Sequence, residues 1–311
     1  MRSVSRNRGG WTSVSLAYVE RVQQVLDELH DYLPLTLRQL YYQLVAAGFI
    51  ANEHREYAKL SRLLTRARID GIVPWTAIED RARATLQSGG WSCSTDFVQD
   101  ELERFLTGYR RDLLQSQDIA LELWVEKDAL SRICHAAAFS YCVPVVVAKG
   151  FSSVSYVHDC RQRVEANAEQ GQRTVLLYFG DLDPSGWEML PSMLTTLQAE
   201  MGLGEWVEGR RCALLPQQVE DLGLPRNPDA LKRTDSRAAK YIERFSALAV
   251  ELDAVPPATL ERMVREAIEA ELDLSTFDEE RRIEHAEGAS VAALRERVRT
   301  LVESALEGSG E

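Results

Sequence analysis

The stretch TVLLYFGDLDPSG, residues 174–186, decides the fold that we expect for this chain. A continuous apolar run ends at Phe179, and a glycine and two aspartates, Asp181 and Asp183, follow it. A short apolar run that is bounded by turn residues is typical of a buried strand in a parallel sheet. The aspartates then lie beyond the carboxyl end of that strand, where such sheets bind their ligands.

Similar short apolar runs occur on both sides of this stretch, and segments of helical length separate them. The runs are residues 119–125, 143–148 and 211–215, and the helical segments are residues 129–140, 153–168 and 187–200. Strands that alternate with helices predict βαβ units. We therefore expect an α/β fold with a mostly parallel sheet in residues 119–235.

A third acidic residue, Glu126, directly follows the run 119–125. Residues two apart in an extended segment point the same way, so we expect Asp181 and Asp183 to converge with Glu126 at one edge of the sheet. Carboxylate oxygens are the ligands that Mg²⁺ or Mn²⁺ prefers. The alternative is that the two aspartates only cap a turn.

The region before the sheet is predicted to be helical. Helices are expected over residues 14–29, from Thr36 to Gly48, and over residues 55–69 with Gly71 as its C-terminal glycine. Thr36 and Gln39 have the spacing of a capping box. The short runs 72–75 and 77–80 are predicted to pair as the strands of a wing, so that the whole is a winged-helix variant.

The third of these helices has a basic face opposite its apolar one. Net charge also favours DNA here, because residues 36–83 carry eight Lys and Arg against five Asp and Glu. Basic side chains bind the phosphate backbone. The residues expected to contact DNA are Lys59, Arg62, Arg66 and Arg68 on the helix, Arg81 and Arg83 after it, and Lys149 beyond the second strand of the sheet.

The second helix carries a candidate nucleophile. A tyrosine hydroxyl can attack phosphorus and form a phosphotyrosyl enzyme. Arg38 lies four residues before Tyr42 on the same helical face, where it could favour the phenolate and hold a phosphate. The alternative is that Tyr41 and Tyr42 are both packing residues, since tyrosines on amphipathic helices are more often core than catalyst.

Together these motifs resemble a known family. Glu126 with the Asp-x-Asp-Pro-x-Gly segment 181–186 resembles the Toprim domain of topoisomerases and primases. The Lys-Gly-aromatic step at 149–151 and the pattern Arg-x-x-Tyr-Tyr at 38–42 are similar to those of topoisomerase VI A subunits and their meiotic double-strand-break relatives. The resemblance covers roughly residues 36–215, and the short chain looks most like the stand-alone Mini-A relatives of mobile elements.

The resemblance implies a function. Tyr42 would be the nucleophile that cleaves double-stranded DNA through a 5′-phosphotyrosyl bond, and Glu126, Asp181 and Asp183 would hold Mg²⁺. It also implies a two-fold homodimer in which the tyrosine of one protomer works with the metal site of the other. Nothing in the chain looks like the ATPase of the B subunit, and a separate GHKL-type ATPase partner stays open.

Two other functions stay open. A hydrolytic Toprim endonuclease of the plasmid or phage defence type would use a metal-activated water, and Tyr42 would only pack or position DNA. A non-catalytic DNA-binding protein would carry a degenerate site. The overall charge of −12 excludes neither, because residues 251–311 hold sixteen Asp and Glu against seven Lys and Arg, so the acidity is concentrated there.

The remaining sequence features concern domains and location. We expect a winged-helix domain over residues 1–90, a helical connector over 91–118 with a helix at 95–117, a Toprim domain over 119–235 and a helical acidic extension over 236–311. Five cysteines without a C-x-x-C pair indicate neither a disulfide framework nor a zinc site. No apolar run reaches the roughly 18 residues of a membrane span, so a cytoplasmic, nucleoid-associated protein is expected.

Overall fold

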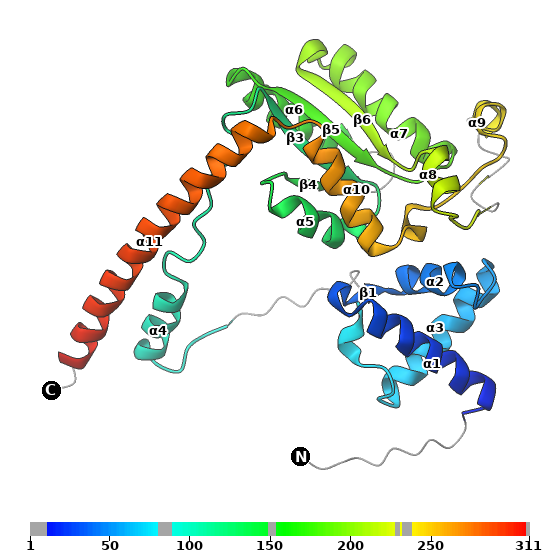
Figure 1. Cartoon of the computed structure of the whole chain (residues 1–311), viewed down its shortest axis with the longest axis horizontal. Coiled ribbons are helices and arrows are strands. Elements are labelled where there is room, and N and C mark those ends of the chain that lie inside the picture. Colours follow the sequence, from blue (N-terminus) through cyan, green and yellow to red (C-terminus); the bar gives the residue numbers. More distant parts are fainter. Residues whose placement is uncertain (1–10, 80–88, 149–153, 228–230, 232–237, 309–311) are drawn as a thin grey trace. The chain divides into compact units, whose positions relative to one another are not determined.

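The computed structural model describes residues 11–79, 89–148, 154–227, 231 and 238–308. The chain divides into two units (Figure 1). Unit 1 contains Met1–Ala82 and Ile119–Ala270, and unit 2 contains Arg83–Asp118 and Glu271–Glu311. The first part of the segment expected as a C-terminal extension, residues 236–270, therefore belongs to the same unit as the sheet.

Unit 1 begins with three helices, as the sequence predicts. They are α1 Ser13–Glu28, α2 Leu37–Ala46 and α3 His54–Ile69, with a 3-10 turn, η1 His30–Tyr32, after α1. The predicted capping box of α2 is confirmed, because Thr36 Oγ1 accepts from the Gln39 N–H at 3.2 Å and Gln39 Oε1 accepts from the Thr36 N–H at 2.7 Å. Gly71, with φ of 69°, follows α3 as predicted.

The predicted wing is wrong in its pairing. Residues 72–75 form no strand, and Trp75–Ala77 is a 3-10 helix, η2. The strand β2, Ile78–Glu79, pairs in parallel with β1, Leu35–Thr36, which directly precedes α2. Pro74 has no N–H to donate to a strand ladder. β2 pairs instead with the extended residues just before α2, a partner that the sequence did not predict.

Four parallel strands form the sheet of unit 1, in the order β4-β3-β5-β6. They are β3 Ile119–Val125, β4 Val145–Val147, β5 Arg173–Phe179 and β6 Val207–Ala213. The predicted parallel sheet is confirmed, although β6 begins at Val207 rather than at residue 211. The chain leaves β3 towards β4 on one side and returns to β5 on the other, so β3 and β5 flank the topological switch point, where such sheets bind ligands.

Helices cover both faces of this sheet (Figure 1). Trp124, Leu176 and Tyr178 point to one face and pack with residues of α6 and α7 in one core. The other face carries α5 and α10, and α10 packs against both α5 and β6. The main helices are α5 Ser131–Phe139, α6 Val154–Glu169, α7 Pro184–Thr195 and α10 Pro257–Glu269.

Short elements connect these layers. They are the 3-10 turns η3 Asp128–Leu130, η5 Gly204–Trp206 and η7 Leu252–Ala254, the π-helical turn η4 Thr196–Glu200, and the helices α8 Pro216–Asp221 and α9 Ala238–Phe245. The predicted break at the two prolines 256 and 257 is confirmed, because α10 begins at Pro257. Proline is well suited to the first turn of a helix, whose N–H groups have no partner in the helix.

Unit 2 contains α4 Ser94–Arg104 and α11 Leu274–Gly308. The predicted helix over 95–117 is wrong beyond Arg104, because residues 105–112 form no helix. In this segment Arg111 pairs with Glu280 and, at 3.0 Å, with Glu287 on α11. The tertiary ion pairs therefore replace the helical hydrogen bonds that the local pattern predicts.

No helix among the described residues is both long and apolar enough to cross a membrane. The longest helix, α11, is 35 residues long and carries charged side chains throughout its length.

Candidate functional site

The site begins where the two central strands of the sheet end. Glu126 directly follows β3, and Asp181 lies two residues after β5, whose last residue Phe179 pairs with Val125. Glu126 Oε2 accepts a hydrogen bond from the Asp181 N–H at 2.8 Å and another from the Tyr178 hydroxyl at 3.2 Å. The structure therefore brings Glu126 and Asp181 together at one sheet edge, as the sequence predicts.

A glycine keeps this edge closely packed. A Cβ atom at Gly186 would lie 2.5 Å from the carbonyl oxygen of Asp181 and 2.9 Å from Glu126 Oε2. Both distances are far shorter than a carbon can make with oxygen without movement of the neighbour. The last residue of the Asp-x-Asp-Pro-x-Gly motif is thus required to be small, first by the backbone carbonyl of Asp181 and then by the carboxylate of Glu126.

Asp183 has a structural role in addition to the one predicted by its spacing. It is the N-cap of α7, and its Oδ1 accepts from the Gly186 N–H at 2.7 Å, which is the turn-capping alternative. Asp181 Oδ1 instead accepts from the Leu252 N–H at 2.8 Å. Asp183 also lies close enough to Glu126 for its negative charge to add to burial in raising the pKa of that carboxyl. Among the described residues no group of three His, Cys, Asp or Glu is arranged to hold a metal ion, so the convergence of Glu126, Asp181 and Asp183 stays a prediction.

Two further carboxylates reach the same edge from a distant part of the chain. Leu182 and Val250 form an isolated antiparallel bridge, which places the segment Glu251 to Asp253 beside the end of β5. Lys127, the residue after Glu126, lies between the two segments. Its Nζ is 2.8 Å from Asp181 Oδ2, 2.8 Å from Glu251 Oε2 and 2.8 Å from Asp253 Oδ2.

Burial governs the ionisation of this cluster. It raises the pKa of Asp181 and of Glu126, in spite of the attraction of Lys127 for both carboxylates. Burial acts against the charged form of Lys127 too, but the three carboxylates around the ammonium outweigh it and raise its pKa. The pKa of Glu251 is lowered, because Lys127 and Arg38 together outweigh the effect of burial.

Arg38 connects α2 to these carboxylates. Its Nη2 donates to Glu251 Oε2, and its Nε lies 3.7 Å from Asp253 Oδ2. Glu251 is held on its other side by Asn227, whose Nδ2 donates to Glu251 Oε1 at 2.8 Å. The guanidinium that was expected to hold a phosphate is therefore engaged by carboxylates of the same chain.

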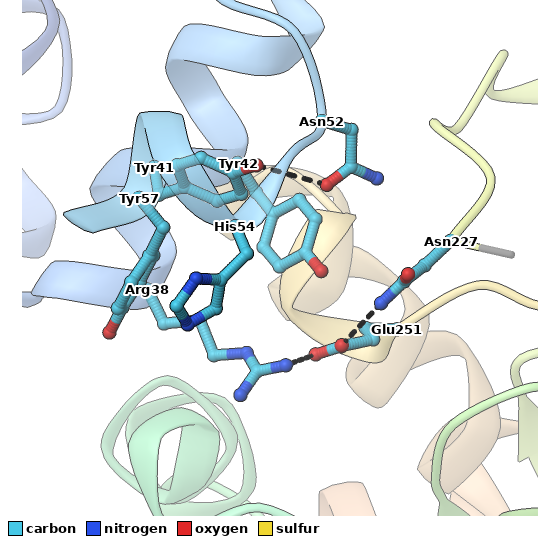
Figure 2. Close-up of a pocket in the computed structure, with 8 residues that line it drawn as sticks. All are labelled: Arg38, Tyr41, Tyr42, Asn52, His54, Tyr57, Asn227 and Glu251. Atoms are coloured by element: carbon cyan, nitrogen blue, oxygen red, sulfur yellow. Dashed lines mark hydrogen bonds and ion pairs between the residues drawn. The ribbon is translucent and has the colours of Figure 1, made fainter. Parts of the chain in front are cut away.

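A pocket of about 350 Å³ lies over this contact, within unit 1. Figure 2 shows the Tyr42 ring projecting towards the side of Glu251 and Asn227, whereas Tyr41 turns towards Asn52. The Tyr41 hydroxyl donates to Asn52 Oδ1 at 3.1 Å. The lining residues are Arg38, Tyr41, Tyr42, Asn52, His54, Tyr57, Asn227 and Glu251.

The Tyr42 hydroxyl is not activated in this arrangement. Burial and the negative charge of Glu251 raise its pKa above the ordinary value, although Arg38 and Lys127 act in the opposite direction. Arg38 lowers the pKa of Tyr42, as expected of a nearby cation. The net result is nevertheless a raised pKa, because Arg38 is itself paired with acidic groups and Tyr42 is only 3% exposed.

The predicted DNA contacts on α3 have unequal surroundings. Arg62 is exposed, whereas Lys59 pairs with Glu56 at 3.5 Å and Arg66 pairs with Asp70 at 3.6 Å. Arg68 donates to the carbonyls of Trp75 and Ile78 at 3.2 and 3.1 Å, so it ties α3 to the segment of β2. The other three predicted contacts, Arg81, Arg83 and Lys149, lie outside the described residues.

Sequence reasoning gave too little weight to three residues of the site. Lys127 directly follows Glu126, and its side chain is 18% exposed and surrounded by carboxylates. Glu251 and Asp253 lie in a segment that the sequence explains equally well as a loop before a helix. Their signal in the sequence was the acidic pair itself within the apolar run 248–255, because charged residues are buried only with partners.

Comparison with protein-family models, with curated proteins and with solved structures gives no match to this chain.

Proposed function

We propose that this chain is a metal-dependent DNA-cleaving transesterase of the topoisomerase VI A type, similar to the Mini-A relatives, with Tyr42 as nucleophile. One observation carries the proposal. Tyr42 and Arg38 line the same pocket as Glu251, and Glu251 is joined through Lys127 to Asp181 at the switch point of the sheet. A phosphate-attacking group and an acidic sheet edge thus belong to one connected network.

In the proposed reaction the Tyr42 oxygen forms a bond to a DNA phosphorus, and the bond from that phosphorus to the 3′ oxygen breaks. Tyr42 loses its proton, the 3′ oxygen gains one, and the 5′ phosphate stays on the tyrosine. Arg38 would exchange its carboxylate partners for the phosphate.

Glu126 and Asp181 would hold Mg²⁺, with Asp183 as the third ligand that the resemblance implies. The donor set fits this ion chemically, since it consists of carboxylate oxygens at a ligand-binding sheet edge. When bound, the ion would neutralise charge that develops on the phosphate during transfer. Asp183 Oδ1 caps α7, so its Oδ2 would be the ligand atom.

The test is covalent trapping on labelled supercoiled DNA with Mg²⁺, stopped with denaturant. The wild type is expected to carry label on the protein, and Tyr42→Phe is expected to carry none. Tyr41→Phe is the matched control, because Tyr41 lies next in sequence but bonds Asn52, and it should retain the adduct. An adduct that survives in Tyr42→Phe would overturn the nucleophile assignment.

A second function is favoured by one observation, the raised pKa of Tyr42. A hydrolytic Toprim endonuclease would not need the phenolate. In that case Tyr42→Phe would still cut DNA and no protein-bound label would form, whereas Glu126→Gln would stop cleavage. Binding of DNA without any cleavage by the wild type would instead indicate a non-catalytic DNA-binding protein.

The homodimer belongs to the same proposal. In the described chain Tyr42 lies beside Glu251 of its own chain, while the resemblance implies a site shared between two protomers. Mixing Tyr42→Phe protein with Glu126→Gln protein separates the two arrangements. Restored adduct formation means that two chains share each site, and no restoration means that each chain carries a complete one.

A further inference from the structure

The ammonium group of Lys127 has the environment of a bound cation. Three carboxylate oxygens, from Asp181, Glu251 and Asp253, each lie 2.8 Å from Nζ. They come from two segments of the chain, which the bridge between Leu182 and Val250 and the hydrogen bond from the Leu252 N–H to Asp181 Oδ1 hold together. The lysine side chain is 18% exposed.

Asp253 shows that this position requires a positive charge. Its side chain is fully buried, and neither of its carboxylate oxygens accepts a hydrogen bond from any described residue. Its neighbours of opposite charge are Lys127 Nζ at 2.8 Å and Arg38 Nε at 3.7 Å. A buried carboxylate without hydrogen bonds is strongly destabilising unless a cation compensates it.

The spacing of the oxygens fits an ammonium rather than a magnesium ion. A distance of 2.8 Å suits a close ion pair between an ammonium nitrogen and a carboxylate oxygen, and the contact with Glu251 is also a hydrogen bond. Mg²⁺ requires oxygens at about 2.0–2.1 Å. The lysine ammonium therefore keeps the three carboxylates farther from the centre of the site than a magnesium ion would.

We propose that Asp181, Glu251 and Asp253 form a cation site whose occupant is the Lys127 ammonium, so that the chain itself supplies one positive charge of the site. This inference rests on the proposed function, because it takes from it the divalent ion that binds beside Glu126. The divalent ion of the proposed function then binds on the side of Asp181 that faces Glu126, and the chain needs one such ion rather than two. Removal of the lysine side-chain charge turns the site into one for a divalent cation.

The lysine also positions Arg38. Glu251 Oε2 is bonded to Lys127 and to Arg38 at the same time, and Glu251 Oε1 is bonded to Asn227. Lys127 thereby fixes the carboxylate against which the guanidinium of α2 rests. The fixed charge at the sheet edge and the placement of the Tyr42 helix thus depend on the same side chain.

The experiment is a count of Mn²⁺ ions bound to the full chain, followed by the electron paramagnetic resonance signal of free Mn²⁺. Lys127→Met, which keeps most of the side-chain volume, is expected to bind one ion more than the wild type. Lys127→Met/Asp253→Asn is expected to lose that additional ion. Asp253→Asn alone is expected to bind as many ions as the wild type, because the lysine and not a metal uses this carboxylate.

Either of two results overturns the proposal. One is an unchanged ion count in Lys127→Met that is folded by circular dichroism. The other is the loss of an ion in Asp253→Asn alone, which also decides the question if Lys127→Met does not fold. The absence of a Tyr42 adduct, or of Mn²⁺ binding by the wild type, would count against the proposed function but would leave the difference between wild type and Lys127→Met readable.

Discussion

Leu182 and Val250 exchange a pair of backbone hydrogen bonds, from each N–H to the carbonyl of the other, at 2.9 and 3.0 Å. This bridge joins the end of β5 to the segment before η7. It places Glu251 and Asp253 against the carboxyl end of the sheet, where Lys127 and Asp181 lie. The acidic edge is consequently built from two parts of the sequence, and its properties can be tested on each part separately.

Glu251→Ala is expected to destabilise the protein by about 3 kcal/mol, because it leaves Lys127 and Arg38 with fewer partners for their buried or half-buried charges. Glu251→Gln keeps the shape and part of the hydrogen bonding and should cost less. Urea unfolding measures both. Glu266→Ala is the control, since Glu266 pairs with Arg262 at the surface of α10 and should change stability by about 0.5 kcal/mol or less.

Gly186→Ala is expected to abolish DNA cleavage and to weaken Mn²⁺ binding, because the added methyl group displaces the Glu126 carboxylate or the Asp181 backbone. Gly204→Ala is the matched control, since a Cβ there meets no atom within 4 Å. Titration with Mn²⁺ and a plasmid cleavage assay provide the comparison. Equal binding by the two variants would show that the packing of Gly186 does not set the position of Glu126.

Arg62→Ala is expected to weaken DNA binding and to reduce the slope of log K against log salt by about 0.9, the value for one lost phosphate contact. Arg62 is exposed on α3, so the protein should stay folded. Arg297→Ala, at an exposed position of the acidic α11, should change neither quantity. Fluorescence anisotropy over a series of salt concentrations gives both slopes, and an unchanged slope in Arg62→Ala would argue against α3 as the DNA-binding helix.

The N-terminus of α11 is expected to lose stability in acid. Hydrogen bonds from Ser275 and Thr276 lower the pKa of Asp273 from 3.8 to about 2. A lowered folded-state pKa means that the carboxylate stabilises the helix above pH 3.8 and that this contribution is lost as the pH falls towards 2. Hydrogen exchange of the first turn of α11 should therefore rise over this range.

Asp273→Asn is the matched control for that measurement. Asparagine is also a good N-cap but does not titrate, so exchange in this variant should not respond to pH between 4 and 2 beyond the intrinsic dependence of the chemistry. Asp273→Ala should exchange faster than the wild type at neutral pH. The same pH response in wild type and Asp273→Asn would show that another group governs the end of the helix.

Local patterns predicted most of the secondary structure. Local sequence is enough to predict the capping box of Thr36 and Gln39, because its hydrogen bonds join residues three apart. It is also enough to predict the strand in residues 119–125, because a short apolar run is typical of a buried strand. The two predictions that failed depended on distant partners. Residues 105–112 form no helix, and Arg110 and Arg111 within them pair with glutamates of α11. Ile78–Glu79 pairs with β1 instead of with residues 72–75.

The sequence by itself determined the parallel sheet, because alternating strands and helices allow few topologies. It also determined that Glu126 and Asp181 lie together, because both follow the carboxyl ends of neighbouring parallel strands. Only the tertiary structure decided what surrounds that edge. Glu251 lies 124 residues from Lys127 and 213 from Arg38 along the chain, and no local pattern relates them. They meet because buried carboxylates are stable only beside cations, and the fold brings Lys127 and Arg38 within reach.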